Sequence, residues 1–122
     1  MAQFKEQTLL SAVVATTTSA PFNVEGYKRI GLQFLAASIS AGNGVFTVDG
    51  TIDGTNWVAL NTLIDNVTNT NLQGPTRVAS KTLSANGSVL VWIDDFLGLK
   101  AIRVTATRTT DGAYSCFATA SE

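Results

Sequence analysis

Hydrophobic and polar residues alternate through short stretches of this chain, and residues 45–60 show the pattern most clearly. Phe46, Val48 and Ile52 are separated by threonine, aspartate and glycine, and this period of two is typical of a strand with one buried face. The letters DGTN follow at 53–56, and these residue types suit a tight turn. A tryptophan then begins the return strand. The pattern therefore predicts a β-hairpin over 45–60.

Similar runs recur along the chain, separated by glycine, asparagine and aspartate, and helix-period stripes are absent. The letters NG at 86–87 predict a hairpin turn, and DG at 111–112 predicts a second hairpin between the last two strands. About eight such strands predict an all-β fold, an antiparallel β-sandwich of either the jelly-roll or the immunoglobulin-like type. Outside the hairpin over 45–60, the expected strands are 7–18, 27–38, 77–83, 88–93, 99–108 and 113–120.

The phase of each strand also predicts which side chains form the core between two packed sheets. Side chains at every second position of a strand point to the same layer. The expected core residues are Leu10, Val14, Ile30, Leu32, Phe34, Phe46, Val48, Trp57, Leu90, Trp92, Ile102, Val104 and Cys116.

With 122 residues, the chain is long enough to bury its own core, so we expect a single domain over 1–122. Its formal net charge is −1, and lysine and arginine form no run that would attract a nucleic acid. The N-terminal residues lack the pattern of a signal peptide, and no stretch is apolar enough for a membrane-spanning helix. We therefore expect synthesis in a cytoplasm, with neither a nucleic acid nor a membrane as a partner.

The chain contains no histidine, which removes the commonest general base and the commonest metal ligand. The lone Cys116 lies mid-strand and is expected to be a buried apolar side chain rather than a nucleophile. Asp53 and Asp111 stand in turns, Asp94 and Asp95 begin a loop, and no calcium-binding repeat accompanies them. The sequence therefore predicts no catalytic residue, no metal site and no cofactor, and a protein that is not an enzyme.

Residues 61–76 form the least regular stretch and are rich in asparagine and threonine. A loop of this length within a small domain is often functional. One interpretation is an extended arm that packs on a neighbouring subunit, with candidate partner contacts at Asn66, Asn69, Asn71 and Leu72. The other is a surface loop held by its own apolar residues, Leu63, Ile64 and Leu72. The N-terminal segment 1–6 is a second candidate arm.

Trp57 and Tyr114 both follow Asp-Gly turns and are the candidate aromatic surface. Exposed aromatic rings on a sheet face or loop rim can stack on sugars, so a carbohydrate-binding or adhesion module is one functional hypothesis. Packing in the core or on a sheet face is the alternative for both residues, because tryptophan and tyrosine favour strands in general.

Four motifs resemble, in order, those of small β-sandwich virion structural proteins of tailed bacteriophages: YKRIGLQF at 27–34, TIDGTNW at 51–57, KAIRV at 100–104 and TDGAY at 110–114. The resemblance implies a non-enzymatic capsid decoration (cement) protein that is located in the virion. Such a protein would bind the major capsid protein or another virion protein, act as a homo-oligomer and stabilise the shell through subunit contacts. A neck or tail accessory protein is the alternative within the same resemblance.

Overall fold

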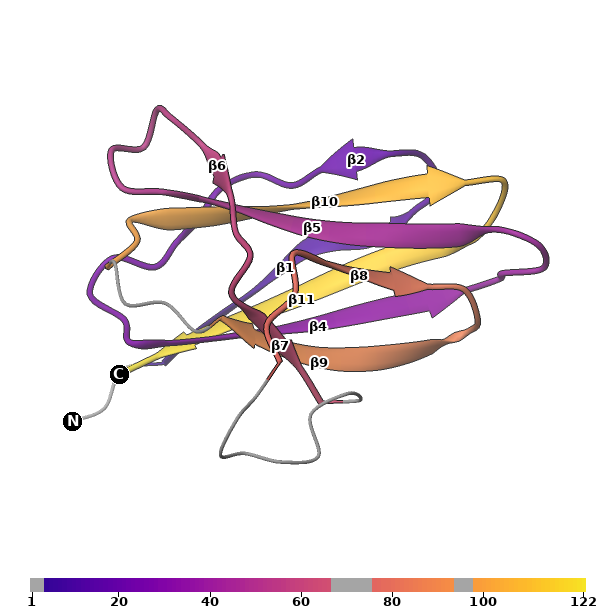
Figure 1. Ribbon diagram of the computed structural model, residues 1–122. Helices are drawn as coiled ribbons and strands as arrows, with labels where there is room; N and C mark the ends of the chain where they lie inside the picture. The colour runs from indigo at the N-terminus through magenta and orange to yellow at the C-terminus, as the bar shows by residue number, and fades with distance from the viewer. Residues whose placement is uncertain (1–3, 67–75, 94–97) are drawn as a thin grey trace.

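The computed structural model describes residues 4–66, 76–93 and 98–122 and folds them into two antiparallel sheets packed face to face (Figure 1). Sheet A has the strand order β1-β11-β4-β9-β7. Sheet B has the order β2-β10-β5-β6, with β3 also paired to β10 and β8 to β5. The predicted antiparallel β-sandwich is confirmed. The strands are β1 Phe4–Val13, β2 Thr17–Thr18, β3 Phe22–Asn23, β4 Arg29–Ala37, β5 Asn43–Thr51, β6 Val58–Ala59, β7 Leu63–Asp65, β8 Ser80–Leu83, β9 Gly87–Ile93, β10 Ala101–Thr109 and β11 Ala113–Ser121.

The pairing order of the strands is nested along the chain. The first strand, β1, pairs with the last, β11; β2 and β3 pair with β10; β4 pairs with β9; and β5 pairs with β8. The two short strands β6 and β7 are additions at the middle of the chain, where they extend the edges of β5 and β9. This nested order is that of a jelly roll, which decides between the two predicted sandwich types.

Two predicted hairpins are wrong. β8 lies in sheet B beside β5, whereas β9 lies in sheet A between β4 and β7, and β10 and β11 are divided between the sheets in the same way. The turns at 86–87 and 111–112 therefore carry the chain from one layer to the other instead of joining neighbouring strands. Turn residues specify a change of direction, whereas the partner of each strand is chosen by long-range packing.

The hairpin over 45–60 is confirmed, because β5 pairs antiparallel with β6 and Asp49 lies opposite Ala59. Ile52 belongs to the turn of this hairpin, where its side chain is exposed, so its predicted place on the buried face is wrong.

The described part of the stretch 61–76 contains one short strand, β7, which pairs with β9. Leu63 and Ile64 within β7 are buried, as the interpretation of a surface loop held by its own apolar residues requires. Residues 67–75, which include Leu72, lie outside the described residues. Residues 4–6 of the expected N-terminal arm instead pair with 119–121 as the start of β1, so the arm prediction is wrong for them.

The core lies between the inward faces of the two sheets. Phe34 of β4 and Phe46 of β5 join the layers at its centre, where their rings stack with centroids 4.4 Å apart. Burial confirms the predicted core residues Leu10, Ile30, Leu32, Phe34, Phe46, Val48, Ile102, Val104 and Cys116.

Four predicted core residues are not buried. Val14 follows the end of β1 and is exposed, and Trp57 is half-buried in the hairpin turn. Leu90 and Trp92 of β9 point outward, because the alternate residues of that strand are the ones that face the core: Val89, Val91 and Ile93. The run SVLVWI is apolar at both phases, and a shift of one residue exchanges the two faces of a strand.

Candidate functional site

The outward face of sheet A is the candidate functional site, because large apolar side chains gather on it. The exposed fractions are 39% for Phe117, 52% for Leu90 and 37% for Trp92, and the half-buried Leu35 lies on the same face. The register brings these residues together across β11, β4 and β9. Phe117 of β11 and Leu90 of β9 both lie opposite Gln33 of β4. Two residues away along β4, in the next row of this face, Trp92 of β9 lies opposite Gly31. Large exposed apolar residues that gather on one face in this way are candidates for an interaction surface.

The outward face of sheet B has a different composition. It carries mainly hydroxyl side chains, and two of them, Thr18 and Thr105, hydrogen-bond to each other at 2.8 Å. The only ion pair on this face among the described residues joins Arg103 to Asp49 at 3.2 Å. The outward face of sheet A is therefore the more apolar of the two faces. The outward residues of sheet B are Thr18, Val45, Thr47, Asp49, Ser80, Thr82, Arg103, Thr105 and Thr107.

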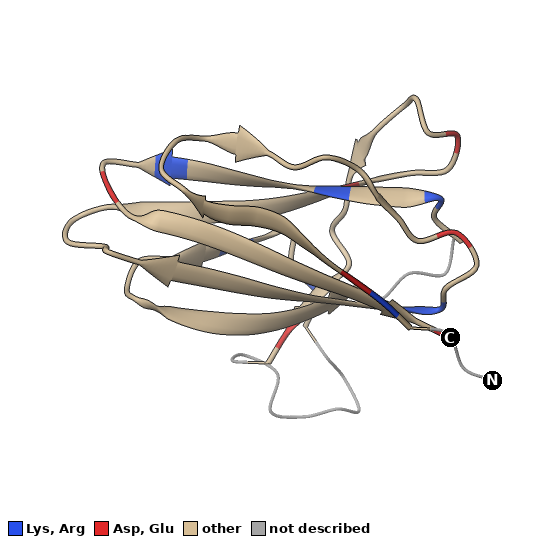
Figure 2. Ribbon diagram, turned by 180° about the vertical axis from the view of Figure 1, so that it is seen from behind, with Lys and Arg blue, Asp and Glu red and all other residues tan. Residues whose placement is uncertain are grey.

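Many charged residues of the described chain lie near strand ends and in loops, and others lie within strands (Figure 2). On the outward face of sheet A, the charged positions among the described residues are Glu6 of β1 and Arg29 of β4, and both lie toward one end of the face. The centre of the face, around Gln33, therefore carries no charged side chain among these residues.

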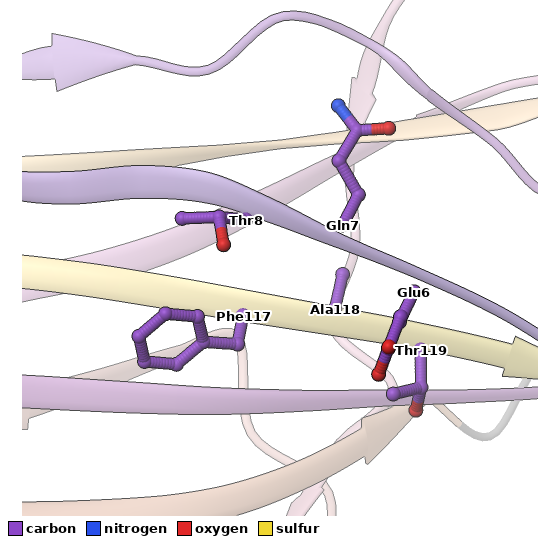
Figure 3. A pocket seen from close by; sticks show the side chains of 6 residues that line it. All are labelled: Glu6, Gln7, Thr8, Phe117, Ala118 and Thr119. Atoms are coloured by element: carbon purple, nitrogen blue, oxygen red, sulfur yellow. The ribbon is translucent and has the colours of Figure 1, made fainter.

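Two open hollows indent this face. One, of about 400 Å³, lies over β1 and β11, where Glu6 and Thr119 lie side by side and Phe117 stands further along β11 (Figure 3). The other, of about 340 Å³, lies over β4 and β9; Arg29, Gly31 and Trp92 are among its lining residues. Gly31 contributes no side chain to this hollow, and the hydroxyl of Thr119 lies next to it and donates to its carbonyl at 3.5 Å.

The predicted aromatic surface of Trp57 and Tyr114 is wrong. Tyr114 is fully buried, because it occupies the inward phase of β11 together with Cys116, and its ring lies over Gly44 and Gly112. Trp57 stays near the surface, but the guanidinium of Arg103 covers its ring at 4.5 Å from the centroid.

Asn66 is the one predicted partner contact that the structure describes; Asn69, Asn71 and Leu72 lie outside the described residues. The Asn66 main chain and side chain both engage the main chain of Leu90. Its N–H donates to the Leu90 carbonyl at 3.0 Å, and its Oδ1 accepts from the Leu90 N–H at 3.0 Å. Asn66 therefore extends the edge of sheet A next to the apolar face, and its role as a partner contact stays a prediction.

The turn aspartates hold loops together. The carboxylate of Asp111 accepts hydrogen bonds from the backbone N–H groups of Ser40, Ala41 and Gly42, at 2.9–3.3 Å, and so ties the β4–β5 loop to the β10–β11 loop. These bonds, led by the one from Ala41, hold the pKa of Asp111 below its usual range. Asp53 accepts from the backbone N–H groups of Asn56 and Thr55, which lowers its pKa in the same way.

Acid should therefore destabilise the protein. The folded-state pKa of Asp111 lies below the unfolded value of about 3.9, so its contribution is complete above that pH and is lost as the pH falls toward the folded pKa. We expect Asp111→Asn to flatten the dependence of unfolding free energy on pH between about pH 4 and pH 2. Urea denaturation at three pH values measures this, and an unchanged slope would contradict the loop contacts.

The one cysteine of the chain, Cys116, is buried. Burial raises the pKa of the Cys116 thiol to about 12, so it stays protonated and inert at neutral pH. Among the described residues, no group of three or more histidine, cysteine, aspartate or glutamate side chains is placed to hold a metal ion. None of these residues forms a helix that is long and apolar enough to cross a membrane.

Neither a protein-family model nor a curated protein sequence matches this chain. Among solved structures, the crystal structure of SPBc2 prophage-derived protein YomS is similar, with a TM-score of 0.67. The chain shares its fold with a prophage-derived protein. The two sequences are 14% identical, and the alignment covers 100% of this chain and 96% of YomS. The structural similarity therefore extends over the whole sandwich and is not confined to one of its parts.

The sequence contained a signal for part of the apolar face. Because Cys116 was correctly placed in the core, the period of two puts Tyr114 inward and Phe117 outward. No comparable signal existed for Leu90 and Trp92, since both phases of β9 are apolar.

Proposed function

We propose that this chain is a non-enzymatic structural protein of a bacteriophage particle, specifically a capsid decoration protein that stabilises the shell through subunit contacts. The observation that carries the proposal is the exposed apolar face of sheet A, centred on Phe117, Leu90 and Trp92, which can bind another subunit of the particle, either a second copy of this chain or a shell protein. Burial of such a face against a partner is favourable by about 25 cal/mol for each Å² of apolar surface. The fold shared with a prophage-derived protein and the four phage-like sequence motifs support the same role.

A decoration protein can stabilise a shell through many weak contacts, and it does not require a single strong one. Each copy that joins neighbouring shell subunits adds a small free energy, and the repetition of the contact over the shell multiplies its effect. The chain's partner is then the major capsid protein or another virion protein, and neither a cofactor nor an enzymatic step is involved.

Labelling of purified particles tests this proposal. Antibodies raised against the protein, coupled to gold, should label the heads of intact particles from a producing bacterial culture, and mass spectrometry should find the chain in those particles. Label confined to the neck or tail would overturn the decoration role in favour of an accessory protein. Absence of the chain from purified particles would overturn the virion role altogether.

A second candidate function is carbohydrate binding, which the position of Trp92 at the open hollow over β4 and β9 favours. Under this hypothesis, titration with a mixture of glycans quenches tryptophan fluorescence, and Trp92→Ala abolishes the quenching. Trp57→Ala is the matched control, because Arg103 already covers that ring. A flat titration of the unaltered protein would reject the hypothesis.

A further inference from the structure

We propose that the outward face of sheet A pairs with the same face of a second copy, around a two-fold axis that runs parallel to β4. This inference rests on the proposed function, for which the sequence motifs imply a homo-oligomer. It assigns the apolar face to the contact between copies, which leaves the other surfaces of the chain for the shell.

The strand order of sheet A places β4 at the centre of the face, where a two-fold axis can run parallel to it. β4 is the central strand of five, with β11 on one side and β9 on the other, and both neighbours are antiparallel to it. A two-fold axis parallel to β4 places β11 of one copy over β9 of the other, and β1 over β7. The strands that face each other then run in the same direction, and residues that lie at the same height along β4 face each other. Each residue on one side of β4 therefore meets the residue in the same row on the other side.

The apolar residues match under this operation. Phe117 and Leu90 are the two neighbours of Gln33, so Phe117 of one copy meets Leu90 of the other, twice in the pair. Their contact would bury two of the most exposed apolar side chains at the centre of the face. Gln33 lies on the axis, where two primary amides can hydrogen-bond to each other.

The side chains that would meet in the row of Gly31 also complement each other in size. Thr119 and Trp92 are the two neighbours of Gly31, so the bulky Trp92 ring meets the small Thr119 side chain. Thr119 forms one wall of the hollow over β1 and β11, and Glu6 forms another. The indole of Trp92 thus enters the hollow of the opposite copy, where the Glu6 carboxylate is placed to accept its N–H. Arg29 lies at the open end of the β4 column, where its exposed side chain can turn to water.

The area fits a weak, reversible interface. The axis stacks β4 on β4, β11 on the seven residues of β9 and β1 on the three residues of β7, so each face overlaps the other over about 29 residues, or about 460 Å² of flat area at about 4.8 Å between strands and about 3.3 Å for each residue. Two such faces bury about 920 Å² before side-chain relief is counted, which is in the range of weak and transient interfaces, below about 1,200 Å². We therefore expect dimers that form reversibly and increase with protein concentration.

Sedimentation equilibrium over a concentration series tests the pairing. The unaltered protein should approach twice its chain mass of 12.8 kDa. Phe117→Glu should raise the dissociation constant by about 100-fold, because the new carboxylate would be buried against Leu90. Leu90→Glu is a second variant at a more exposed position and should act in the same way. Val58→Glu is the matched control: Val58 is 67% exposed on β6 of sheet B and should leave the dimer unchanged.

Cross-linking tests the axis itself. Gln33→Cys places a thiol on the axis, and a short bis-maleimide should join two copies at this position. Cys116 is buried and protonated, so it should not compete. Thr107→Cys, exposed on the outward face of sheet B, should stay uncoupled.

Three results would overturn the inference: a monomer at every concentration, a dimer that both glutamate variants leave intact, or equal cross-linking at the two thiols. None of them bears on where gold label lies on particles, so the virion role stands or falls separately. Conversely, a confirmed dimer that is absent from particles would keep this pairing and reject the virion role.

Discussion

Replacing Gly44 with alanine should lower the free energy of unfolding by about 3 kcal/mol, because the new methyl group would overlap the ring of Tyr114. The tyrosine has no room to move away. It is fully buried, Phe46 lies edge-on to it with ring centroids 6.0 Å apart, and its hydroxyl donates to the Asp111 carbonyl at 2.9 Å. Urea denaturation measures the loss as a lower midpoint concentration of urea, with an unchanged dependence of the unfolding free energy on urea concentration.

Gly31→Ala is the matched control for this prediction. Its added Cβ would lie 3.0 Å from Oγ1 of Thr119, a side chain on the outward face that can rotate, so the expected loss is less than about 1 kcal/mol. Tyr114→Leu alone should destabilise the core, but it should reduce the cost of Gly44→Ala, since the obstructing ring is gone. Equal losses for the two glycine variants would show that Tyr114 does not close over Gly44.

Local patterns predicted most of the long strands of this fold, because these strands have one buried face and the alternation of their residues records which face it is. The predicted strand 7–18 is wrong, since it is divided between β1 of sheet A and β2 of sheet B. β5 and β10 illustrate this: Val48 and Val104 are at the predicted phase and are buried. The layer of each strand was not predictable in this way. The Asp-Gly turn before β11 is chemically similar to the turn before β6, yet one turn crosses between sheets and the other closes a hairpin. That difference depends on contacts between residues far apart in the chain.

The sequence did not predict the apolar outward face of sheet A, for a related reason. Prediction of the core assumes that apolar residues face inward, so a strand that is apolar on both faces yields the wrong phase. Leu90 and Trp92 were assigned to the core and instead stand on the outward face of sheet A. Such a conflict between pattern and burial is expected where a surface has to bind something, because the apolar residues there serve a partner and not the fold.

Asp65→Ala should cost about 3 kcal/mol of stability, because it removes the buried carboxylate that faces Lys81. The Asp65 side chain is only 1% exposed, and its carboxylate lies 3.7 Å from Nζ of Lys81, which is itself 19% exposed. The pair connects β7 of sheet A to β8 of sheet B, at the end of the sandwich where the two short strands were added to the jelly roll. Removal of one charge leaves the other partly buried without this partner, which is costlier than loss of the attraction alone.

The ion pair of Asp49 and Arg103 provides the comparison. Its side chains are 25% and 34% exposed, and water and salt screen it, so Asp49→Ala should cost less than about 1 kcal/mol. Urea denaturation of both variants at neutral pH and in added salt separates the two cases. The Asp65 effect should persist in salt, and the Asp49 effect should shrink. If both variants lost the same small amount, Asp65 would have to be open to solvent, and β7 would not be packed at the edge of sheet A as described.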